Sequence, residues 1–225
     1  AGHAGFQVAA SLRQHGFAGR ICLLNDEAHL PYQRPPLSKA YLKGEGRPDS
    51  LMFRPDKFYR DQTIELIADR AVSIDRGARK LQIASGASLD YWHLVLATGA
   101  RNRLLDIPNA GLEDVRYLRV LDESEALRQR IASCQRVVVV GAGFIGLEFA
   151  ATARAKGLGV DVIELGARVM ARAVTVEISE YFQARHTAAG IRIHLGVQAT
   201  AIEGDGGCVT GASLSDGRHI PADLV

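Results

Sequence analysis

The sequence lacks an excess of charge of either sign. Lys and Arg together number 27 and Asp and Glu 25, which leaves a formal net charge of +2. A chain so near neutrality has no electrostatic footprint for nucleic acid or a membrane surface, although a local basic docking patch stays open. The most apolar run, residues 137–147, is interrupted by three glycines and followed by Glu148, so it cannot span a bilayer. We therefore expect no nucleic-acid and no membrane partner.

Cysteine is scarce as well. Cys22, Cys134 and Cys208 are odd in number and far apart, and none lies in a CxxC or a metal-ligand spacing. This pattern argues against a disulfide framework and gives no metal site. It predicts a reducing compartment, the cytoplasm. Cys22 lies within an apolar run and is predicted to be a small core residue.

An initiating methionine is also missing. The chain begins with AGHAG, which reads as the end of a glycine-rich turn without a strand before it. It closes with IPADLV, in which residues 222–225 read as the start of a strand. We therefore expect a piece of a longer protein, incomplete at both ends. Its 225 residues are enough for one large domain or two small ones.

The clearest pattern that is present lies in the second half. Residues 136–165, RVVVVGAGFIGLEFAATARAKGLGVDVIEL, predict a strand over 137–140, a glycine turn, a helix over 144–156 and a second strand over 160–165. This order is a βαβ unit.

Three glycines form a GxGxxG motif at its turn. Gly141 suits the tight turn, Gly143 lets the backbone approach a pyrophosphate, and Gly146 permits close packing of helix on strand. The phosphates would lie at the N-terminus of the helix, where free N–H groups favour an anion. Because strand, turn, helix and second strand are all present, we favour dinucleotide binding over a merely close-packed turn.

A carboxylate follows at the place where a ribose is held. Glu164 ends the second strand 18 residues after Gly146 and can accept hydrogen bonds from both ribose hydroxyls. It would repel a 2′-phosphate, so it favours NADH over NADPH. Arg168 and Arg172 leave the alternative open, since either can hold a phosphate if the loop folds back.

The first half repeats this plan. Gly2 and Gly5 align with Gly143 and Gly146 at an offset of 141 residues, and Asp26 takes the ribose position 21 residues after Gly5. A helix over about residues 6–15 and a strand in RICLLND complete the copy. Alone this half fits an ordinary turn equally well, but a second copy in one chain favours a nucleotide site.

Between the copies the pattern changes to short strands over residues 72–75, 80–83 and 89–96, a meander. It ends in LVLATGAR, and the residues that would bring backbone close to the first glycine turn are Ala97, Thr98 and Gly99. The alternative is a buried strand that leaves by a glycine turn. After Gly190, alternating strands with Asp-Gly turns belong to the second nucleotide domain. The predicted class is α/β, with two Rossmann-like domains, each with a β-meander, over residues 1–108 and 109–225.

One further segment combines rigidity with charge. Residues 29–44, HLPYQRPPLSKAYLKG, place Pro35 and Pro36 between Arg34 and Lys39. Two prolines fix two φ angles and supply no backbone donor, so this segment is held stiffly against another group.

Two dinucleotide sites with an ATG strand between them resemble the two-dinucleotide flavoprotein reductases of the glutathione-reductase-like fold. Four stretches, PYQRPPLSKAYLKG, YLRVLDESEAL, GAGFIGLEFAA and RVMARAV, are similar to NADH-dependent [2Fe–2S] ferredoxin reductases of the putidaredoxin reductase type. The resemblance implies FAD and NADH as cofactors, hydride transfer from NADH to the flavin, and single-electron transfer to a ferredoxin. That ferredoxin would supply a P450 or a ring-hydroxylating oxygenase. Disulfide reductases of this superfamily carry a redox cysteine in the matching segment, and residues 31–42 contain none.

The resemblance also implies roles for individual residues. The residues expected to meet FAD are Gly2, Ala4, Gly5, Asp26, Arg34, Pro36, Lys39, Val72, Ala97, Thr98, Gly99, Arg101 and Arg119. Those expected to meet NADH are Gly141, Gly143, Ile145, Gly146, Glu148, Glu164 and Arg172. Arg34 and Pro36 would border the isoalloxazine ring, so the group behind the proline pair would be the flavin.

Lys39 and Glu148 are the expected catalytic residues. We hypothesise an ion pair between them, joining the two domains beside the flavin N5; in the alternative, both side chains only face water. Two other functions remain. One is a flavoprotein of the apoptosis-inducing-factor type with a structural or signalling role. The other is a rubredoxin or nitrite-reductase partner subunit of the same fold.

Overall fold

The computed structural model describes residues 1–225, and the chain divides into two compact units. The first comprises Ala1–Arg34 and Arg47–Ala100, and the second comprises Pro35–Gly46 and Arg101–Val225. Both contain helices with strands, so the predicted α/β class is confirmed. The predicted domain boundary between residues 108 and 109 stays a prediction.

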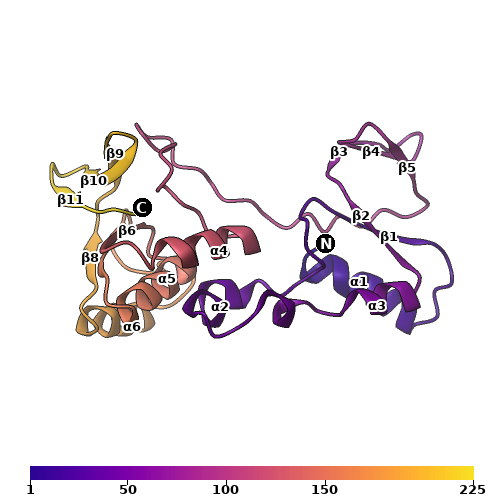
Figure 1. The fold of residues 1–225 in the computed structure, drawn as a ribbon, viewed down its shortest axis with the longest axis horizontal. Coiled ribbons are helices and arrows are strands. Elements are labelled where there is room, and N and C mark those ends of the chain that lie inside the picture. The colour runs from indigo at the N-terminus through magenta and orange to yellow at the C-terminus, as the bar shows by residue number, and fades with distance from the viewer. The chain divides into compact units, whose positions relative to one another are not determined.

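The first unit contains a small parallel sheet covered by a helix (Figure 1). Its elements are α1 (His3–Gln14), β1 (Ile21–Asn25), η2 (Pro48–Leu51), α3 (Asp56–Asp61), β2 (Ile64–Ala68), β3 (Ala71–Asp75), β4 (Lys80–Ile83) and β5 (Ser88–Asp90). β1 pairs with β2 in parallel, and Ile21 and Leu23 of β1 pack with Phe6 and Ala9 of α1. The predicted helix and strand of the first copy are therefore confirmed.

Cys22 does not lie in this core. Side chains alternate along a strand, so Ile21 and Leu23 face α1 while Cys22 is exposed. Its thiol donates a hydrogen bond to Glu65 Oε2 at 3.2 Å. Partial burial, this hydrogen bond and the negative charge of Glu65 raise the pKa of the thiol to about 11. The prediction of a core cysteine is wrong because an apolar run does not say which of its residues face inward.

The antiparallel meander of β3, β4 and β5 is present, but it is shorter than predicted. The strand expected over residues 89–96 ends at Asp90. Val95 and Leu96 are 58% and 68% exposed, and no strand pairs with them. An extended segment without a paired neighbour has no ladder of hydrogen bonds to make it a strand.

The second unit contains two three-stranded sheets, one parallel and one antiparallel. Its elements are η1 (Pro35–Ser38), α2 (Ala40–Lys43), α4 (Leu121–Arg130), β6 (Arg136–Val140), α5 (Phe144–Ala155), β7 (Gly159–Glu164), α6 (Val176–Ala188), β8 (Arg192–Leu195), β9 (Ala199–Asp205), β10 (Cys208–Leu214) and β11 (His219–Pro221). β6, β7 and β8 run parallel in that order. The predicted βαβ unit is confirmed: Val137 and Val139 of β6 and Val160 and Val162 of β7 lie in one core with α5.

The antiparallel sheet has the order β11, β10, β9. As predicted, Asp205–Gly206 and Asp216–Gly217 lie in its two hairpin turns. The expected strand at residues 222–225 is reduced to a single parallel bridge between Leu224 and Val137.

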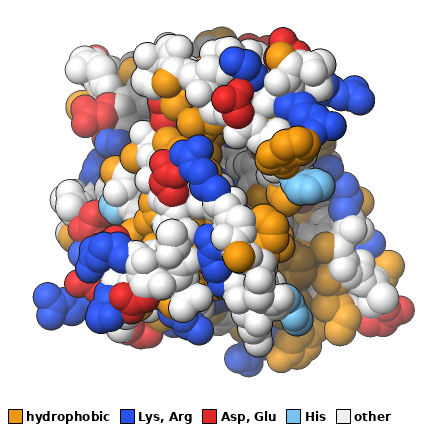
Figure 2. All heavy atoms as spheres, turned by 90° about the vertical axis from the view of Figure 1, so that its right-hand side faces the viewer, with side chains coloured by type: hydrophobic (Ala, Val, Ile, Leu, Met, Phe, Trp, Pro, Cys, Tyr) orange, Lys and Arg blue, Asp and Glu red, His pale blue; other side chains and the backbone are white.

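The face drawn in Figure 2 has no single dominant charge. On the face drawn in Figure 2, Lys and Arg side chains are interspersed with Asp and Glu and do not gather in one patch. None of the helices combines the length and the apolar character that a membrane span needs.

Candidate functional site

The glycine turn of the second unit connects β6 to α5. Gly141 has a φ of 106°, which a side chain disfavours, and Gly143 is the N-cap of α5. A Cβ on Gly146 would lie 2.1 Å from the carbonyl oxygen of Gly141, so only glycine fits there. A Cβ on Gly143 would meet nothing within 4 Å. The turn therefore has no room for a side chain at Gly146 but is open at Gly143. At this open side, the first N–H groups of α5 have no hydrogen-bond partner within the helix.

Glu164 reaches this turn from the end of β7. Its Oε2 accepts a hydrogen bond from the Ala142 N–H at 2.8 Å, and its Oε1 accepts one from the Gly166 N–H at 2.7 Å. The structure therefore brings the carboxylate and the GxGxxG turn together, as the spacing predicts. Each oxygen keeps a further lone pair for another donor.

Neither of the two arginines after β7 forms a hydrogen bond with the glycine turn as Glu164 does. The Arg168 guanidinium donates to the carbonyls of Val174 and Ala171, at 2.9 and 2.8 Å, and so holds its own loop. Arg172 is exposed. Ile145, in the first turn of α5, is 47% exposed.

Lys39 and Glu148 form the expected ion pair. Lys39 Nζ lies 2.8 Å from Glu148 Oε2, and 28% of the Glu148 side chain is exposed against 51% for Lys39. The alternative in which both side chains only face water is therefore wrong. Both residues lie in the second unit, and their assignment to two different nucleotide-binding domains stays a prediction. The pair forms without any rearrangement between units.

Segment 35–46 is in the second unit because it is anchored there. The Ser124 hydroxyl of α4 donates to the Leu37 carbonyl at 2.7 Å, and Leu42 is fully buried in the core that contains α5. The Tyr41 hydroxyl donates to Glu125 at 2.8 Å. Burial of the Tyr41 ring, with this hydrogen bond, raises its pKa to about 12. The group behind the proline pair is thus α4 and α5; contact with a flavin stays a prediction.

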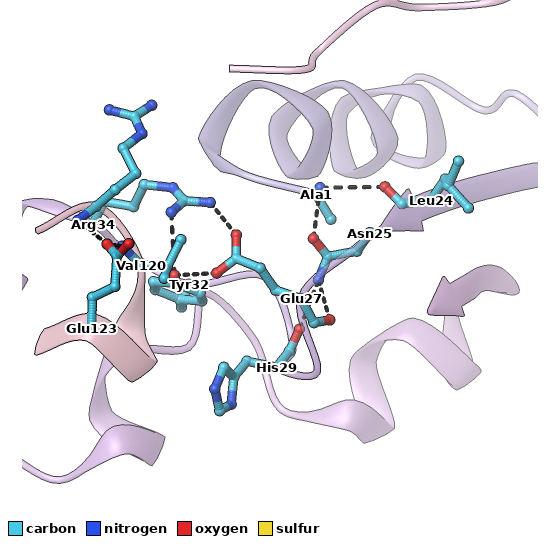
Figure 3. Close-up of polar contacts among 10 residues, drawn as sticks. Ala1, Leu24, Asn25, Glu27, His29, Tyr32, Arg34, Val120 and Glu123 are labelled. Carbon is cyan, nitrogen blue, oxygen red and sulfur yellow. Dashed lines mark hydrogen bonds and ion pairs between the residues drawn. The ribbon is translucent and has the colours of Figure 1, made fainter. Parts of the chain in front are cut away.

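Arg34 occupies a polar cluster in the first unit (Figure 3). Its guanidinium pairs with Glu27, lies 3.3 Å from the Tyr32 hydroxyl and stacks 5.2 Å above the Tyr32 ring. The Tyr32 hydroxyl also donates to Glu27. A Cβ on Gly2 would lie 3.9 Å from Arg34 Nε, so this cation stands beside the first glycine turn. Nothing in the sequence pattern singled out Glu27 or Tyr32.

Residues 97–99 also lie beside that turn. A Cβ on Gly5 would be 3.6 Å from the Ala97 Cβ and 3.2 Å from Leu23 Cδ1. Gly5 is therefore a close-packing glycine, as predicted from its alignment with Gly146. Thr98 and Gly99 are exposed, and Asp26 is exposed at the end of β1.

The other residues expected at the FAD site are less defined. Val72 is 60% exposed on β3. Ala4 lies in the first turn of α1, and Pro36 is half-buried in η1. Arg101 is exposed, and the Arg119 backbone N–H donates to Glu123 at 2.5 Å. Pro36, Lys39, Arg101 and Arg119 belong to the second unit and the remaining predicted FAD residues to the first.

A βαβ unit with an open glycine turn and a carboxylate at the end of its second strand defines a dinucleotide-binding α/β protein. The family model for pyridine nucleotide-disulphide oxidoreductases matches residues 1–225, and the chain belongs to that family.

Relatives with curated names and solved structures resemble the whole chain. Rhodocoxin reductase of Rhodococcus erythropolis is 47% identical over 225 residues, which are 100% of this chain and 53% of that protein. The ferredoxin reductase for the CYP199A2 system of Rhodopseudomonas palustris superposes with a TM-score of 0.98 at 70% identity, covering 100% of this chain and 56% of that one. The reductase in the putidaredoxin reductase–putidaredoxin complex superposes with a TM-score of 0.96 at 38% identity. The match covers 100% of this chain and 55% of that one. The chain thus spans about half the length of its relatives.

Proposed function

We propose that residues 1–225 form the nucleotide-binding part of an FAD-containing, NADH-dependent ferredoxin reductase of the cytoplasm. Electrons pass from NADH through the flavin to a [2Fe–2S] ferredoxin that supplies a P450 or a ring-hydroxylating oxygenase. The main support for this proposal comes from segment 35–46. The segment has no cysteine, and its Lys39 forms an ion pair with Glu148 in the helix after the GxGxxG turn. Without a redox cysteine in this segment, electrons must leave the flavin for a separate acceptor.

The second unit fits NADH. The space in front of Gly143 and the N-terminus of α5 suit a pyrophosphate, because N–H groups and the helix dipole favour an anion there. Gly141, Ile145 and Gly146 would shape this turn. Glu164 would accept from the ribose hydroxyls and repel a 2′-phosphate, while Arg172 would lie nearby in the exposed loop. Glu148 would lie by the nicotinamide.

The first unit fits the nucleotide part of FAD. Its glycine turn has Gly5 packed next to Ala97, and the backbone at Ala4 and Gly5 would meet the pyrophosphate. Arg34, which lies next to Gly2, would border the isoalloxazine ring. Asp26 would take the ribose and Val72 the adenine. When bound, FAD accepts a hydride and releases electrons one at a time.

Four more residues are expected to meet the flavin. Arg101 and Arg119 would lie near its phosphates or edge, and Pro36 would border its ring. Lys39 would place a cation by the ring that becomes anionic on reduction. Glu148 holds this cation in place through the 2.8 Å ion pair.

A rubredoxin is the second candidate acceptor. Rubredoxin-NAD(+) reductase of Pseudomonas putida is 40% identical over 226 residues, and the match covers 100% of this chain and 59% of that protein. The apoptosis-inducing-factor type of function would be favoured by a basic surface, and the formal net charge of +2 does not favour it.

The test uses the natural protein that carries this chain. Its flavin spectrum is recorded first, and NADH and NADPH are then compared as donors to a [2Fe–2S] ferredoxin, a rubredoxin and a disulfide. We expect bound flavin, a preference for NADH, and ferredoxin as the fastest acceptor. Absence of flavin, or reduction of the disulfide, would overturn the proposal; rubredoxin as the fastest acceptor would favour the second candidate.

A further inference from the structure

Ser38 is the second hydrogen-bond donor to Glu148. Its hydroxyl donates to Glu148 Oε2 at 2.5 Å, and the same oxygen receives Lys39 Nζ at 2.8 Å. The other carboxylate oxygen, Oε1, accepts no hydrogen bond in the structure. The carboxylate is therefore tied at one oxygen and open at the other.

Ser38 is the more rigid of the two donors. Its residue is only 6% exposed, whereas half of the Lys39 side chain is in water. A serine hydroxyl has one side-chain torsion, while a lysine has four and loses more entropy when it is held. The backbone around Ser38 is fixed by the Ser124 hydrogen bond to Leu37 and by the ring of Pro36.

The two contacts therefore differ in what they do. An exposed ion pair is weak and screened by salt. A short hydrogen bond from a buried hydroxyl to a carboxylate is stronger and directional. The Lys39 contact supplies charge beside Glu148, and the Ser38 contact sets the direction of the carboxylate.

We propose that Ser38 is a positioning residue for nicotinamide recognition. By occupying Oε2, it leaves Oε1 of Glu148 as the acceptor for the carboxamide N–H of the nicotinamide. Ser38 thus acts through Glu148 on the nicotinamide half of the dinucleotide and not on its ADP-ribose half. This inference rests on the proposed function, because it takes Glu148 to lie by the nicotinamide.

The test measures binding of NAD⁺ and of ADP-ribose to the oxidised natural protein by titration calorimetry. Ser38→Ala should weaken NAD⁺ binding about tenfold, the loss of a hydrogen bond to a charged group, and leave ADP-ribose binding unchanged. Ser38→Thr keeps the hydroxyl and should restore NAD⁺ binding. In turnover, Ser38→Ala should raise the KM for NADH more than it lowers kcat.

Tyr41→Phe is the matched control. It removes a hydroxyl of the same segment that donates to Glu125 and does not contact Glu148. It should lower the melting temperature and keep the NAD⁺ affinity. If Ser38→Ala does not fold, Ser38→Cys, whose thiol is a poorer donor of similar size, replaces it.

The outcomes separate the two proposals. Equal loss of NAD⁺ and ADP-ribose binding in Ser38→Ala would mean a merely structural role and overturn the inference. So would NAD⁺ binding at wild-type strength in Ser38→Ala when Glu148→Gln weakens it. A wild-type protein that binds neither flavin nor NAD⁺ would overturn the proposed function together with this inference.

Discussion

The hydroxyl of Ser124 donates a hydrogen bond to the carbonyl oxygen of Leu37 at 2.7 Å, across 87 residues of sequence. Both residues are buried, at 0% and 2% exposure. This bond anchors η1 on α4, so the proline-containing segment belongs to the same unit as the GxGxxG turn. The ion pair between Lys39 and Glu148 follows from that anchoring, because it fixes the backbone next to Lys39.

Loss of this anchor should reduce stability. Ser124→Ala leaves the buried Leu37 carbonyl without its donor, which costs about 1–3 kcal/mol in the free energy of unfolding. Urea unfolding compared with the wild type measures the change. Ser50→Ala is the control, because Ser50 is exposed and its hydroxyl bonds only to the local Arg47 carbonyl. Equal stability of the Ser124 variant and the wild type would contradict the anchoring role.

Removal of the lysine charge should slow flavin reduction. Lys39→Met keeps the length and apolar stem of the side chain but removes the cation, and we expect the rate of hydride transfer to fall roughly ten- to a hundredfold. Stopped-flow absorbance of the flavin measures this rate. Lys57→Met is the control, since Lys57 pairs only with the exposed Asp61 one helical turn away. An unchanged rate and an unchanged flavin potential would refute the proposed role of Lys39.

Substitution of the two motif glycines should affect different properties, stability at Gly146 and NADH binding at Gly143. Gly146→Ala places a Cβ 2.1 Å from the Gly141 oxygen, so it should destabilise the second unit by about 1–3 kcal/mol or more. Gly143→Ala meets no protein atom within 4 Å, so stability should stay near the wild type while NADH binding weakens. Thermal unfolding and NADH titration on both variants test the contrast. Similar melting temperatures for the two variants would show that the packing argument is wrong.

The carboxylate of Glu164 should set the preference between the two nicotinamide cofactors. Glu164→Gln keeps an oxygen acceptor near the Ala142 N–H but removes the negative charge. Without repulsion of a 2′-phosphate, the ratio of kcat/KM for NADH over NADPH should fall by about tenfold or more. Steady-state kinetics with both donors measures the ratio. A ratio that does not move would place the discrimination elsewhere, such as at Arg172.

Asp161 should make stability depend on pH. The Asp161 carboxylate is buried on β7, with Arg192 at 2.5 Å and His194 at 2.8 Å. Burial opposes ionisation, but the hydrogen bonds from Arg192 and His194 outweigh it and hold the pKa of Asp161 below its usual value. This carboxylate therefore stabilises the fold above about pH 4, the ordinary value for an unfolded Asp, and the contribution is lost as pH falls through the folded pKa.

The Asp161→Asn variant tests this pH dependence. At about pH 6 it should be less stable than the wild type by about 3 kcal/mol, because a buried charged partner is lost. The difference should shrink as pH falls below about 4 and through the lowered folded pKa, where the wild-type carboxyl also becomes protonated. Urea unfolding across this range measures it, and a constant difference would contradict the prediction.

The sequence by itself determined the βαβ unit of residues 136–165. Its evidence is local: strand, GxGxxG turn, helix and second strand follow each other within residues 136–165, and each step rests on near neighbours. The position of Glu164 beside the turn follows from the same spacing, because the ends of adjacent parallel strands meet at one edge of a sheet. The Lys39–Glu148 pair was also predicted, although from resemblance and not from spacing.

Only the tertiary structure decided which residues that are distant in sequence contact each other. Ser38 and Glu148 are 110 residues apart, and no periodicity connects them. The same holds for Ser124 on Leu37. Sidedness was equally hidden at Cys22, where an apolar run could not say which residues face α1. A strand over residues 91–96 has the right composition but no neighbour to pair with. Local pattern sets the element, whereas contact between remote residues sets its partner, because that contact depends on how the whole chain packs.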